Sequence, residues 1–395
     1  MRCFPCLTGR FLRALTGATL GALWLLGQAS AHAVAPPDST GVRTVGRDSS
    51  AVVQAFTILS AADGRPGKPS NLLSYFTGNR VQVDKPPVGG PALLLMGGGR
   101  EVSAAFTANA YPIVNGGDIV VLRVSGTDGY QDFLYRRLVE ELPADRRAAL
   151  QPNSVETLIV DSAAKADSDY VANAVAKANL IWIAGGDQSA YITHWRGTAL
   201  AAAVRSAYQR GAVVGGISAG MVVMGQWMYD PGAQTAVNSA EAVADPYRAS
   251  IVLTSGAELF DLPLGLNLLP ETHFANRDRM GRLLSFMARL RKDGRSALTY
   301  GVALDENTSL FIDKLGVGSF QRQSVAGRPE GNGYILKEDP ERTTLTQVAA
   351  GLPLIYRHVQ RIKLGPGQSF DFARGTSAQS AVSISVEGAV PVNLY

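Results

Sequence analysis

The run Gly216-Ile217-Ser218-Ala219-Gly220 places a serine between small residues in the Gly-x-Ser-x-Gly form. Small flanking residues allow a sharp turn from a strand into a helix, and such a turn exposes the serine hydroxyl. The apolar segments 212–214 and 221–227 supply the predicted strand and helix. At the start of that helix, the amide of Ala219 would help to stabilise an oxyanion. The run therefore predicts the nucleophile of an acyl transfer, although glycine-rich turns of this kind also bind phosphate or only pack closely.

A serine nucleophile needs a base, which in enzymes is most often a histidine. The sequence has four histidines, and His32 falls within a predicted export signal described below. We interpret His194, beside Trp195, and His358, in a late β segment, as structural or surface residues. His273 lies in a loop that enters a predicted helix and is therefore the candidate base.

Three arginines follow His273 in that predicted helix, at positions 277, 279 and 282. The spacing of Arg277, Arg279 and Arg282 does not place all three on one helix face, and a solvated surface is the ordinary interpretation. The alternative is that one or two of them hold a peptide carboxylate, which a planar guanidinium can bind bidentately.

Two acids, Asp305 and Glu306, follow another apolar segment at 301–304. A carboxylate at the end of a strand can orient an imidazole and stabilise its charged form. Asp-Glu-Asn is also an ordinary turn sequence. The pattern alone therefore leaves a catalytic and a structural interpretation open.

Short apolar runs alternate with segments of helical spacing from Pro91 onward. The apolar runs are 92–96, 118–124, 158–160, 180–184 and 212–214, and the helical segments include 131–142, 167–178 and 200–209. This alternation predicts an α/β fold in which helices cover both faces of a parallel sheet. Glycines recur where the strands end, as expected for a site at the carboxyl edge of the sheet. After about Leu310, β segments separated by turns predict a mainly β extension.

The first 33 residues have the form of a secretory signal. Arg2, Arg10 and Arg13 precede an apolar run at 14–26, and Ala31-His32-Ala33 is a small-x-small cleavage site. The apolar run is shorter than the ~20 residues that span a bilayer. We therefore expect cleavage after Ala33 and a secreted or periplasmic protein without a stable membrane anchor.

Cleavage would change both the charge and the cysteine content. It removes three of the 37 basic residues and none of the 33 acidic ones, which leaves 34 against 33. A nearly neutral protein gives no reason to expect nucleic acid as a partner. Cleavage also removes Cys3 and Cys6, the only cysteines. We expect the remaining chain to have no disulfide, no thiol nucleophile and no thiolate metal site.

Five motifs occur in the order found in cyanophycinases, which are serine peptidases of family S51 related to the aspartyl dipeptidases. They are the segment 93–99, Gly185-Gly186-Asp187-Gln188, the serine run 216–220, His273-Phe274 with the three arginines, and Asp305-Glu306. The chain resembles this family from about Pro91 to Leu310. The resemblance implies a three-layer α/β sandwich with a mainly parallel central sheet, of the class I glutamine amidotransferase-like kind. It also implies a homodimer without a cofactor or metal.

The resemblance also implies roles for particular residues. Ser218, His273 and Glu306 would form the catalytic triad. The oxyanion would be held by an amide of Gly186 or Asp187 together with that of Ala219. Gln188 would contact the substrate. The other predicted substrate-binding residues are Glu271, Arg277, Arg279 and Arg282.

The sequence departs from the family pattern immediately before His273. Glu271-Thr272 stands where cyanophycinases have Asp-Gln. Glu271 keeps a negative charge that could receive a substrate guanidinium, whereas Thr272 lacks the amide of glutamine.

We therefore expect four regions: a signal at 1–33, a linker and N-terminal extension at 34–90, a catalytic α/β peptidase domain at 91–319 and a β-rich region at 320–395. The hypothesis is an exported serine exopeptidase that acts on cyanophycin (multi-L-arginyl-poly-L-aspartate) or related β-aspartyl peptides. Ser218 would attack the isopeptide carbonyl, with release of β-aspartyl-arginine dipeptides. The alternatives are a broader serine peptidase or esterase acting on other aspartyl peptides, and a non-catalytic exported binding protein on the same fold.

Overall fold

The computed structural model describes residues 64–263, 266–296, 298–391 and 394–395. The predicted export signal, its cleavage site and the first part of the predicted linker lie outside these residues. In the described part of the chain, no helix is both long enough and apolar enough to cross a bilayer.

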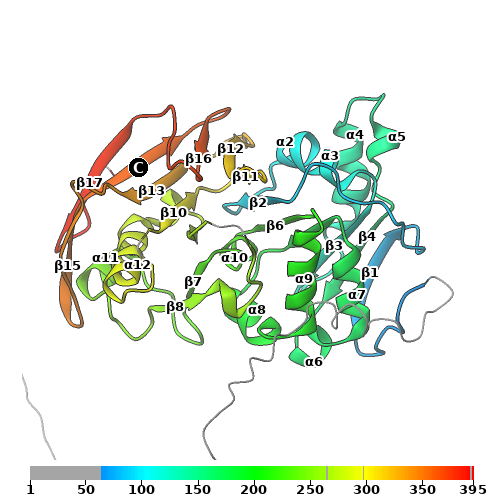
Figure 1. Cartoon of the computed structure of the whole chain (residues 1–395), viewed down its shortest axis with the longest axis horizontal. Helices are drawn as coiled ribbons and strands as arrows, with labels where there is room; N and C mark the ends of the chain where they lie inside the picture. The colour runs from blue at the N-terminus through cyan, green and yellow to red at the C-terminus, as the bar shows by residue number, and fades with distance from the viewer. Residues whose placement is uncertain (1–63, 264–265, 297, 392–393) are drawn as a thin grey trace, which may run out of the picture. The chain divides into compact units, whose positions relative to one another are not determined.

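A large sheet forms around the apolar runs that the sequence predicts as strands. Its strands follow the order β1-β4-β3-β5-β6-β2-β11-β12-β16 (Figure 1). The inner strands run parallel to one another: β2 (Ala92–Met96), β3 (Asp118–Arg123), β4 (Ser154–Ile159), β5 (Leu180–Ile183) and β6 (Val213–Ile217). Antiparallel strands extend both edges: β1 (Leu73–Gly78), β11 (Thr308–Ile312), β12 (Val317–Arg322) and β16 (Ser369–Asp371). The predicted α/β fold with a mainly parallel central sheet is confirmed.

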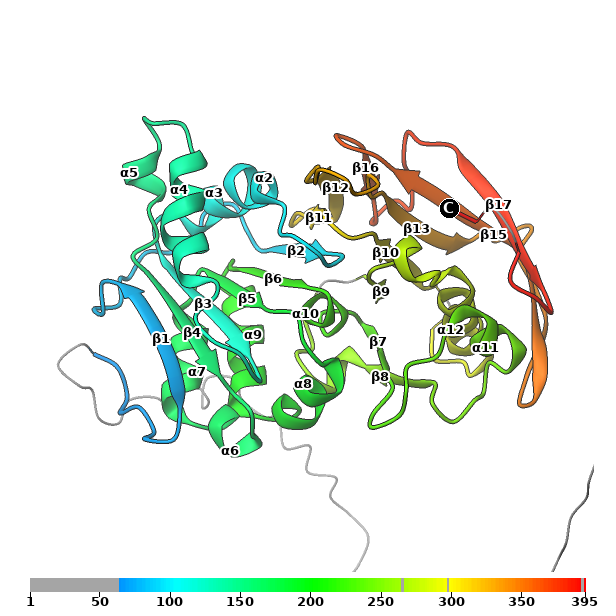
Figure 2. The ribbon, with the colours of Figure 1, turned by 180° about the vertical axis from the view of Figure 1, so that it is seen from behind.

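Helices cover both faces of the large sheet. In β3, Ile119 and Val121 belong to one hydrophobic cluster, whereas Val120 and Leu122 belong to another, because successive side chains of a strand point to opposite faces. The first face carries α2 (Ser103–Ala105), the π-helix η1 (Phe106–Ala110), α3 (Tyr111–Val114), the π-helix η2 (Phe133–Arg137), α4 (Leu138–Glu141) and α5 (Arg147–Leu150). The second carries α6 (Ala163–Ala166), α7 (Asp169–Lys177), α8 (Gln188–Trp195) and α9 (Ala199–Gln209) (Figures 1 and 2).

Side-chain caps start the two longest helices of the second face. The Ser168 hydroxyl accepts from the amide of Val171 at the start of α7. The Thr198 hydroxyl accepts from the amide of Ala201 at the start of α9. Hydroxyl caps of this kind satisfy amides that have no partner within the helix, and they fit the predicted helical segments 167–178 and 200–209.

A smaller sheet contains most of the strands that follow Leu310. Its strands follow the order β14-β15-β13-β10-β9, and β17 pairs with β15. Their bounds are β9 (Leu268–Glu271), β10 (Tyr300–Leu304), β13 (Gly333–Glu338), β14 (Thr344–Ala349), β15 (Leu352–Leu364) and β17 (Ala381–Glu387). The helices α11 (Ser239–Ala244) and α12 (Met280–Lys292) pack against this sheet in a third hydrophobic cluster. The β-rich part of the chain therefore shares one sheet with β9 and β10.

Between the serine run and β9 in sequence, the chain forms a separate antiparallel pair, β7 (Trp227–Asp230) and β8 (Val252–Ser255). The 3₁₀ turn η3 (Gly256–Glu258) follows this pair.

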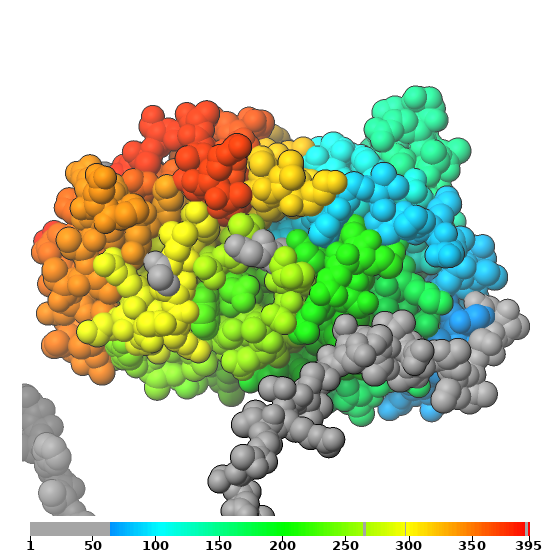
Figure 3. All heavy atoms as spheres, in the orientation of Figure 1, coloured from blue at the N-terminus to red at the C-terminus, as the bar shows by residue number. Residues whose placement is uncertain are grey.

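Strands of the two sheets end close to one another. The space-filling view shows yellow atoms from residues near 310 directly against cyan atoms from residues near 100 (Figure 3). This contact reflects the pairing of β11 with β2. Residues that follow β2, β5, β6, β9 and β10 can thus meet.

Candidate active site

Ser218 occupies a strained turn between β6 and the short helix α10 (Ala219–Val222). Its backbone has φ 55° and ψ −120°, a conformation that a residue with a side chain seldom adopts. The flanking glycines make this turn possible. A Cβ on Gly216 would lie 2.6 Å from the carbonyl of Gly220, and a Cβ on Gly220 would lie 2.0 Å from the carbonyl oxygen of Ile183. The serine run therefore forms the predicted sharp strand-to-helix turn. The helix ends at Val222 and Trp227 begins β7, so the prediction of a helix over 221–227 was wrong beyond Val222.

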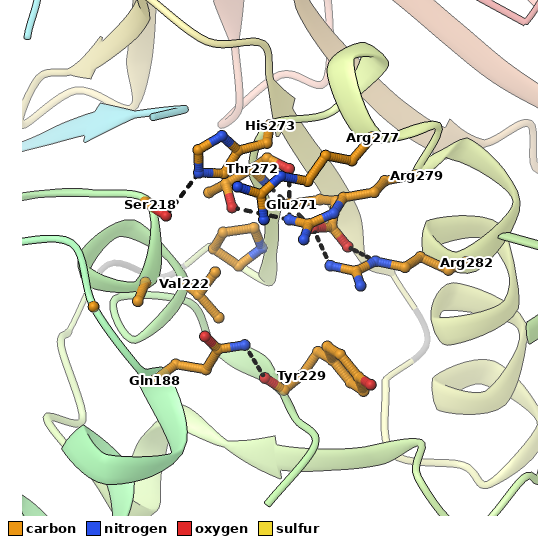
Figure 4. Close-up of a pocket in the computed structure, with 13 residues that line it drawn as sticks. Gln188, Ser218, Val222, Tyr229, Glu271, Thr272, His273, Arg277, Arg279 and Arg282 are labelled. Carbon is orange, nitrogen blue, oxygen red and sulfur yellow. Dashed lines mark hydrogen bonds and ion pairs between the residues drawn. The ribbon is translucent and has the colours of Figure 1, made fainter. Parts of the chain in front are cut away.

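The structure brings Ser218, His273 and Glu306 into one hydrogen-bonded series. The Ser218 hydroxyl lies 2.9 Å from Nε2 of His273 (Figure 4). Nδ1 of the same ring lies 2.7 Å from Oε1 of Glu306. With Nδ1–H donating to the carboxylate, Nε2 is left to accept the serine proton, as in a Ser-His-acid triad.

The ring of His273 is held by the glycines that follow β2. The amide of His273 donates to the carbonyl of Gly97 at 2.8 Å. A Cβ on Gly98 would lie 2.3 Å from Cε1 of the imidazole. Sequence reasoning assigned no role to Gly98, although three consecutive glycines after a buried strand were a signal that the backbone approaches another group closely.

Asp305 and Glu306 take different roles in the structure. Asp305 is buried and accepts from the amides of Ala275 and Asn332, both at 2.8 Å. Burial raises the pKa of Asp305, and those two amides oppose the rise. Glu306 faces His273, and its own amide donates to Oδ1 of Asn276 at 2.9 Å. Asp305 thus joins the His273 turn to the end of β10, while Glu306 is free to orient the imidazole.

The surroundings of His273 keep its ring neutral at neutral pH. Burial is the largest influence and lowers the pKa of His273 below its ordinary value. The hydrogen bond to Glu306 acts in the opposite direction, and the positive charges of Arg277 and Arg279 lower the pKa further. A neutral imidazole can accept a proton, so this arrangement suits a general base.

Two of the three predicted oxyanion donors line the pocket that contains Ser218, and the third does not. Gly186 and Ala219 line the same pocket as Ser218. Ala219 is the first residue of α10, so its N–H has no acceptor within the helix and is free to bind an anion. Asp187 is not part of the described pocket lining, and its carboxylate instead caps α8 by accepting from the amide of Ser189 at 2.9 Å.

A polar pocket of about 80 Å³ opens beside Ser218. Figure 4 shows three arginines reaching into it from the side of α12, with Gln188 and Tyr229 bordering it elsewhere. The lining consists of Gly186, Gln188, Ser218, Ala219, Val222, Tyr229, Pro270, Glu271, Thr272, His273, Arg277, Arg279 and Arg282. All five predicted substrate-binding residues are therefore in one pocket.

The three arginines reach this pocket because the predicted helix begins later than the sequence suggests. Arg277 ends a 3₁₀ turn, η4 (Ala275–Arg277), and Asp278 has a left-handed backbone with φ 46°. Arg279 precedes α12, and Arg282 lies in its first turn. The expectation that all three belong to one helix was wrong, and the break at Asp278 turns their side chains to the same side.

Glu271 is already engaged by arginine within the protein. It is 2% exposed, and Arg282 binds it bidentately, with Nε 2.7 Å from Oε2 and Nη2 2.7 Å from Oε1. Arg279 adds a contact to Oε1 at 3.2 Å. Burial acts to raise the pKa of Glu271, but the two arginines outweigh burial and lower the pKa. A substrate guanidinium would have to displace Arg282, so the structure does not fit the expectation that Glu271 receives one.

The other two arginines leave positive charge facing the pocket. Burial lowers the pKa of Arg279 to about 10, so its guanidinium stays charged at neutral pH. It donates to the carbonyl of Thr272 at 2.8 Å. Within the part of the chain that the structure describes, the guanidinium of Arg277 makes no hydrogen bond or ion pair. With one glutamate against three arginines, the pocket carries a surplus of positive charge and favours an anionic group.

Gln188 and Tyr229 complete the far wall of the pocket. The side-chain amide of Gln188 lies 3.5 Å from the carbonyl oxygen of Tyr229, a weak contact that a substrate could replace. The guanidinium of Arg282 lies 5.0 Å from the centre of the Tyr229 ring, within the range of a cation–π contact. Among the described residues, no group of three or more His, Cys, Asp or Glu side chains is arranged to hold a metal ion.

Comparison with known proteins identifies relatives of this chain. Residues 138–317 match the model of peptidase family S51. The chain is 33% identical over 153 residues to a cyanophycinase from Geminocystis herdmanii (strain PCC 6308), which covers 38% of this chain and 47% of that protein. It is 27% identical over 259 residues to a cyanophycinase from Trichormus variabilis (strain ATCC 29413 / PCC 7937), with 64% and 74% covered.

The chain thus spans about half the length of the Geminocystis relative. Among solved structures, it is similar to a peptidase from an acI-B1 Actinobacterium at 17% identity and a TM-score of 0.41, over 72% of this chain and 97% of that one.

Proposed function

We propose that this chain is an exported serine exopeptidase of peptidase family S51 that hydrolyses cyanophycin to β-aspartyl-arginine dipeptides. The observation that carries the proposal is the hydrogen-bonded series of Ser218, His273 and Glu306 at the mouth of a cationic pocket. Relatives described as cyanophycinases support the choice of substrate.

The proposed reaction proceeds in two steps. His273 takes the proton of Ser218 as its hydroxyl attacks the scissile carbonyl, and Glu306 orients the ring and stabilises its charged form. The amides of Gly186 and Ala219 bind the oxyanion. His273 then protonates the leaving amine, which leaves an acyl group on Ser218. A water molecule, activated by the same imidazole, hydrolyses that ester and restores the serine.

The bond that breaks must be a main-chain amide between two aspartates. Attack on the isopeptide carbonyl, which the sequence suggested, would release free arginine and leave the polyaspartate backbone whole. Release of a β-aspartyl-arginine dipeptide requires that the isopeptide bond survive and the main-chain bond break. We therefore assign the attack by Ser218 to the main-chain carbonyl.

Arg277 and Arg279 are the proposed binding groups for a substrate carboxylate. Arg277 reaches the pocket without a described partner, and Arg279 is only partly neutralised by Glu271. A carboxylate held there would place the adjacent carbonyl beside Ser218.

Products and catalytic residue can be tested in one experiment. Purified protein is incubated with cyanophycin and the soluble products are identified by mass spectrometry. β-Aspartyl-arginine is expected, free arginine would indicate attack on the isopeptide bond, and no product would contradict the substrate assignment. Turnover by Ser218→Ala equal to that of the unmodified protein would contradict the mechanism.

A serine peptidase acting on other aspartyl peptides is the second candidate. The specific observation that favours it is the bidentate contact between Glu271 and Arg282, which removes a negative group that could have received an arginine side chain. A panel of α- and β-aspartyl dipeptides with and without arginine discriminates between the two. Equal kcat/KM values across the panel would favour the broader enzyme.

Covalent labelling distinguishes an enzyme from a binding protein. A fluorophosphonate probe reacts only with an activated serine, so labelling that is lost in Ser218→Ala supports the enzyme. Export is tested by the N-terminal sequence of the protein recovered outside the cytoplasm, which we expect to start after Ala33. A homodimer is the expected assembly, and sedimentation equilibrium measures it.

A further inference from the structure

The segment between β9 and α12 must be held in place from outside, because its own sequence is strained. It carries His273, Arg277 and Arg279, and both His273 and Asp278 have left-handed backbones, each with φ 46°. A left-handed conformation costs a residue with a side chain on the order of 1 kcal/mol. Arg279, which precedes α12, makes no side-chain cap. Local interactions alone therefore leave the start of α12 poorly fixed.

The phenol of Tyr395 supplies the missing cap from 115 positions away. Its oxygen accepts from the amide of Met280 at 3.0 Å, and this amide is the first of α12, one of those without an acceptor in the helix. The same oxygen donates to Oδ1 of Asp278 at 2.8 Å. Burial raises the pKa of Tyr395, so the phenol keeps the proton that it donates. One hydroxyl thus holds both the strained residue and the helix start.

A second hydroxyl binds the backbone of the same residue. Ser239 of α11 donates to the carbonyl of Asp278 and accepts from the amide of Arg282 at 3.2 Å. Asp278 is therefore fixed at its carboxylate by Tyr395 and at its carbonyl by Ser239. Because both caps come from other elements, the side chain of Arg279 does not have to cap α12 and can extend into the pocket.

The smaller sheet anchors Tyr395 in turn. Its ring makes edge contacts with Phe274, at 5.4 Å between centroids, and with Tyr334 of β13, at 6.1 Å. The neighbouring carbonyl of Leu394 accepts from Arg361 of β15 at 2.7 Å. Phe274 directly follows His273, so the ring of Tyr395 packs against one end of the arginine-bearing segment and its hydroxyl holds the other.

We propose that Tyr395 is a positioning residue that sets Arg277 and Arg279 in the pocket and so determines the affinity for the acidic substrate. Tyr395 is not part of the described pocket lining. Its hydroxyl fixes Asp278. Because Arg277 and Arg279 flank Asp278 in sequence, the position of Asp278 sets the direction of both side chains. The inference rests on the proposed function because its main readout is turnover of an aspartyl peptide.

The test compares Tyr395→Phe with Tyr356→Phe in the full chain. Tyr395→Phe keeps the ring contacts and removes only the hydroxyl. Tyr356→Phe removes a buried phenol that also donates to a carboxylate, that of Glu338, but does not line the pocket. For each variant kcat, KM, the melting temperature and the rate of fluorophosphonate labelling are measured.

We expect Tyr395→Phe to raise KM at least threefold, with kcat and the labelling rate within twofold of those of the unmodified protein. Tyr356→Phe should leave KM unchanged. An unchanged KM in Tyr395→Phe, or an equal rise in both variants, would overturn the proposal, because either result makes Tyr395 a general stabiliser. If Tyr395→Phe does not fold, Asp278→Gly, which tolerates the left-handed backbone and removes the acceptor of the phenol hydroxyl, must raise KM in the same way.

Failure of the proposed function is recognised separately. It would appear as an absence of turnover in the unmodified protein, before any variant is compared. The proposal on Tyr395 fails only when the unmodified protein is active and its KM does not respond to loss of the phenol hydroxyl.

Discussion

Ser218 and Arg279 face the same pocket, yet the chain positions them by different means. The turn at Ser218 is determined by its immediate neighbours, Gly216 and Gly220, and by the parallel strands on which it packs. The position of Arg279 depends on Tyr395 and Ser239, which are distant in sequence and act through Asp278. The nucleophile is therefore locally encoded, whereas the binding pocket is assembled from several elements.

This difference predicts that mutations can separate catalysis by Ser218 from substrate binding in the pocket. Changes near Ser218 should abolish the chemistry and leave the pocket intact. Changes around Arg279 should weaken substrate binding or the fold and leave the serine reactive. Each of the following predictions tests one side of this separation.

The largest effect is expected from Ser218→Ala. Loss of the nucleophile should lower kcat on the order of 10⁴- to 10⁶-fold, with residual catalysis from the oxyanion site and binding alone. Ser285→Ala is the control, because this serine is buried, donates to the carbonyl of Gly281 within α12 and is not part of the described pocket lining. Single-turnover rates measure both variants. A Ser218→Ala variant that retains a tenth of the original rate would show that another group performs the attack.

On the pocket side, Glu271→Gln should act mainly on stability. Removing the charge leaves Arg282 buried without its bidentate partner, and breaking a buried pair in this way costs about 3–5 kcal/mol. The free energy of unfolding in urea measures the loss. Glu387→Gln breaks an exposed pair with Arg357 and should leave the free energy of unfolding essentially unchanged, since exposed pairs contribute little. Equal effects in the two variants would contradict a structural role for Glu271.

Gly98→Ala tests whether the close approach of Gly98 holds the imidazole of His273, which lies between Ser218 and the arginine-bearing segment. The added methyl group would lie 2.3 Å from the imidazole of His273, so the ring must move. A displacement of about 1 Å at a reacting group lowers kcat roughly 10²-fold. Gly197→Ala is the control, because Gly197 also has a positive φ but has no atom within 4 Å of the added group. It should lose about 1 kcal/mol of stability and keep its kcat.

The same distinction explains what the sequence could predict. The strands β2, β3 and β5 were recognisable as apolar runs, whereas the predicted runs 158–160 and 212–214 cover only two residues each of β4 and β6. The serine run was recognisable because its glycines are adjacent to it in sequence. Glu306 could not be separated from Asp305 by pattern alone, because both follow β10 and only the direction of each side chain decides its role. Resemblance to a family selected Glu306.

Contacts over long sequence separations were not predictable. No periodicity indicates that Gly98 lies against the ring of His273 or that Tyr395 caps α12. The sequence also did not indicate the left-handed backbone of Asp278. It therefore could not show that Arg277, Arg279 and Arg282 face one pocket. Pairing of Glu271 with Arg282 likewise depends on the packing of β9 against α12 and could not be inferred from the charge of either residue.

The smallest predicted effect is a shift in the pH dependence of kcat/KM in Arg277→Gln. It tests whether a charge in the pocket changes the pKa of the base, His273. The positive charge of Arg277 helps to hold the pKa of His273 below its ordinary value, although burial is the larger cause. Only the neutral imidazole accepts the serine proton, so kcat/KM should fall as the pH decreases through the pKa of His273 in the free enzyme. Removing the arginine raises that pKa and shifts the acidic limb of the profile to higher pH.

Matched arginine replacements separate this charge effect from a loss of binding. Arg277→Gln should also raise KM, because the variant has lost one cation in the pocket. Arg328 is not part of the described pocket lining and is not among the charges that shift the pKa of His273, so Arg328→Gln should change neither KM nor the acidic limb. Arg277→Lys restores the charge without the planar guanidinium, so it should return the limb toward its original position while KM stays raised. If the limb stays in place in Arg277→Gln, the charge of Arg277 does not reach His273, and the pocket and the base are electrostatically independent.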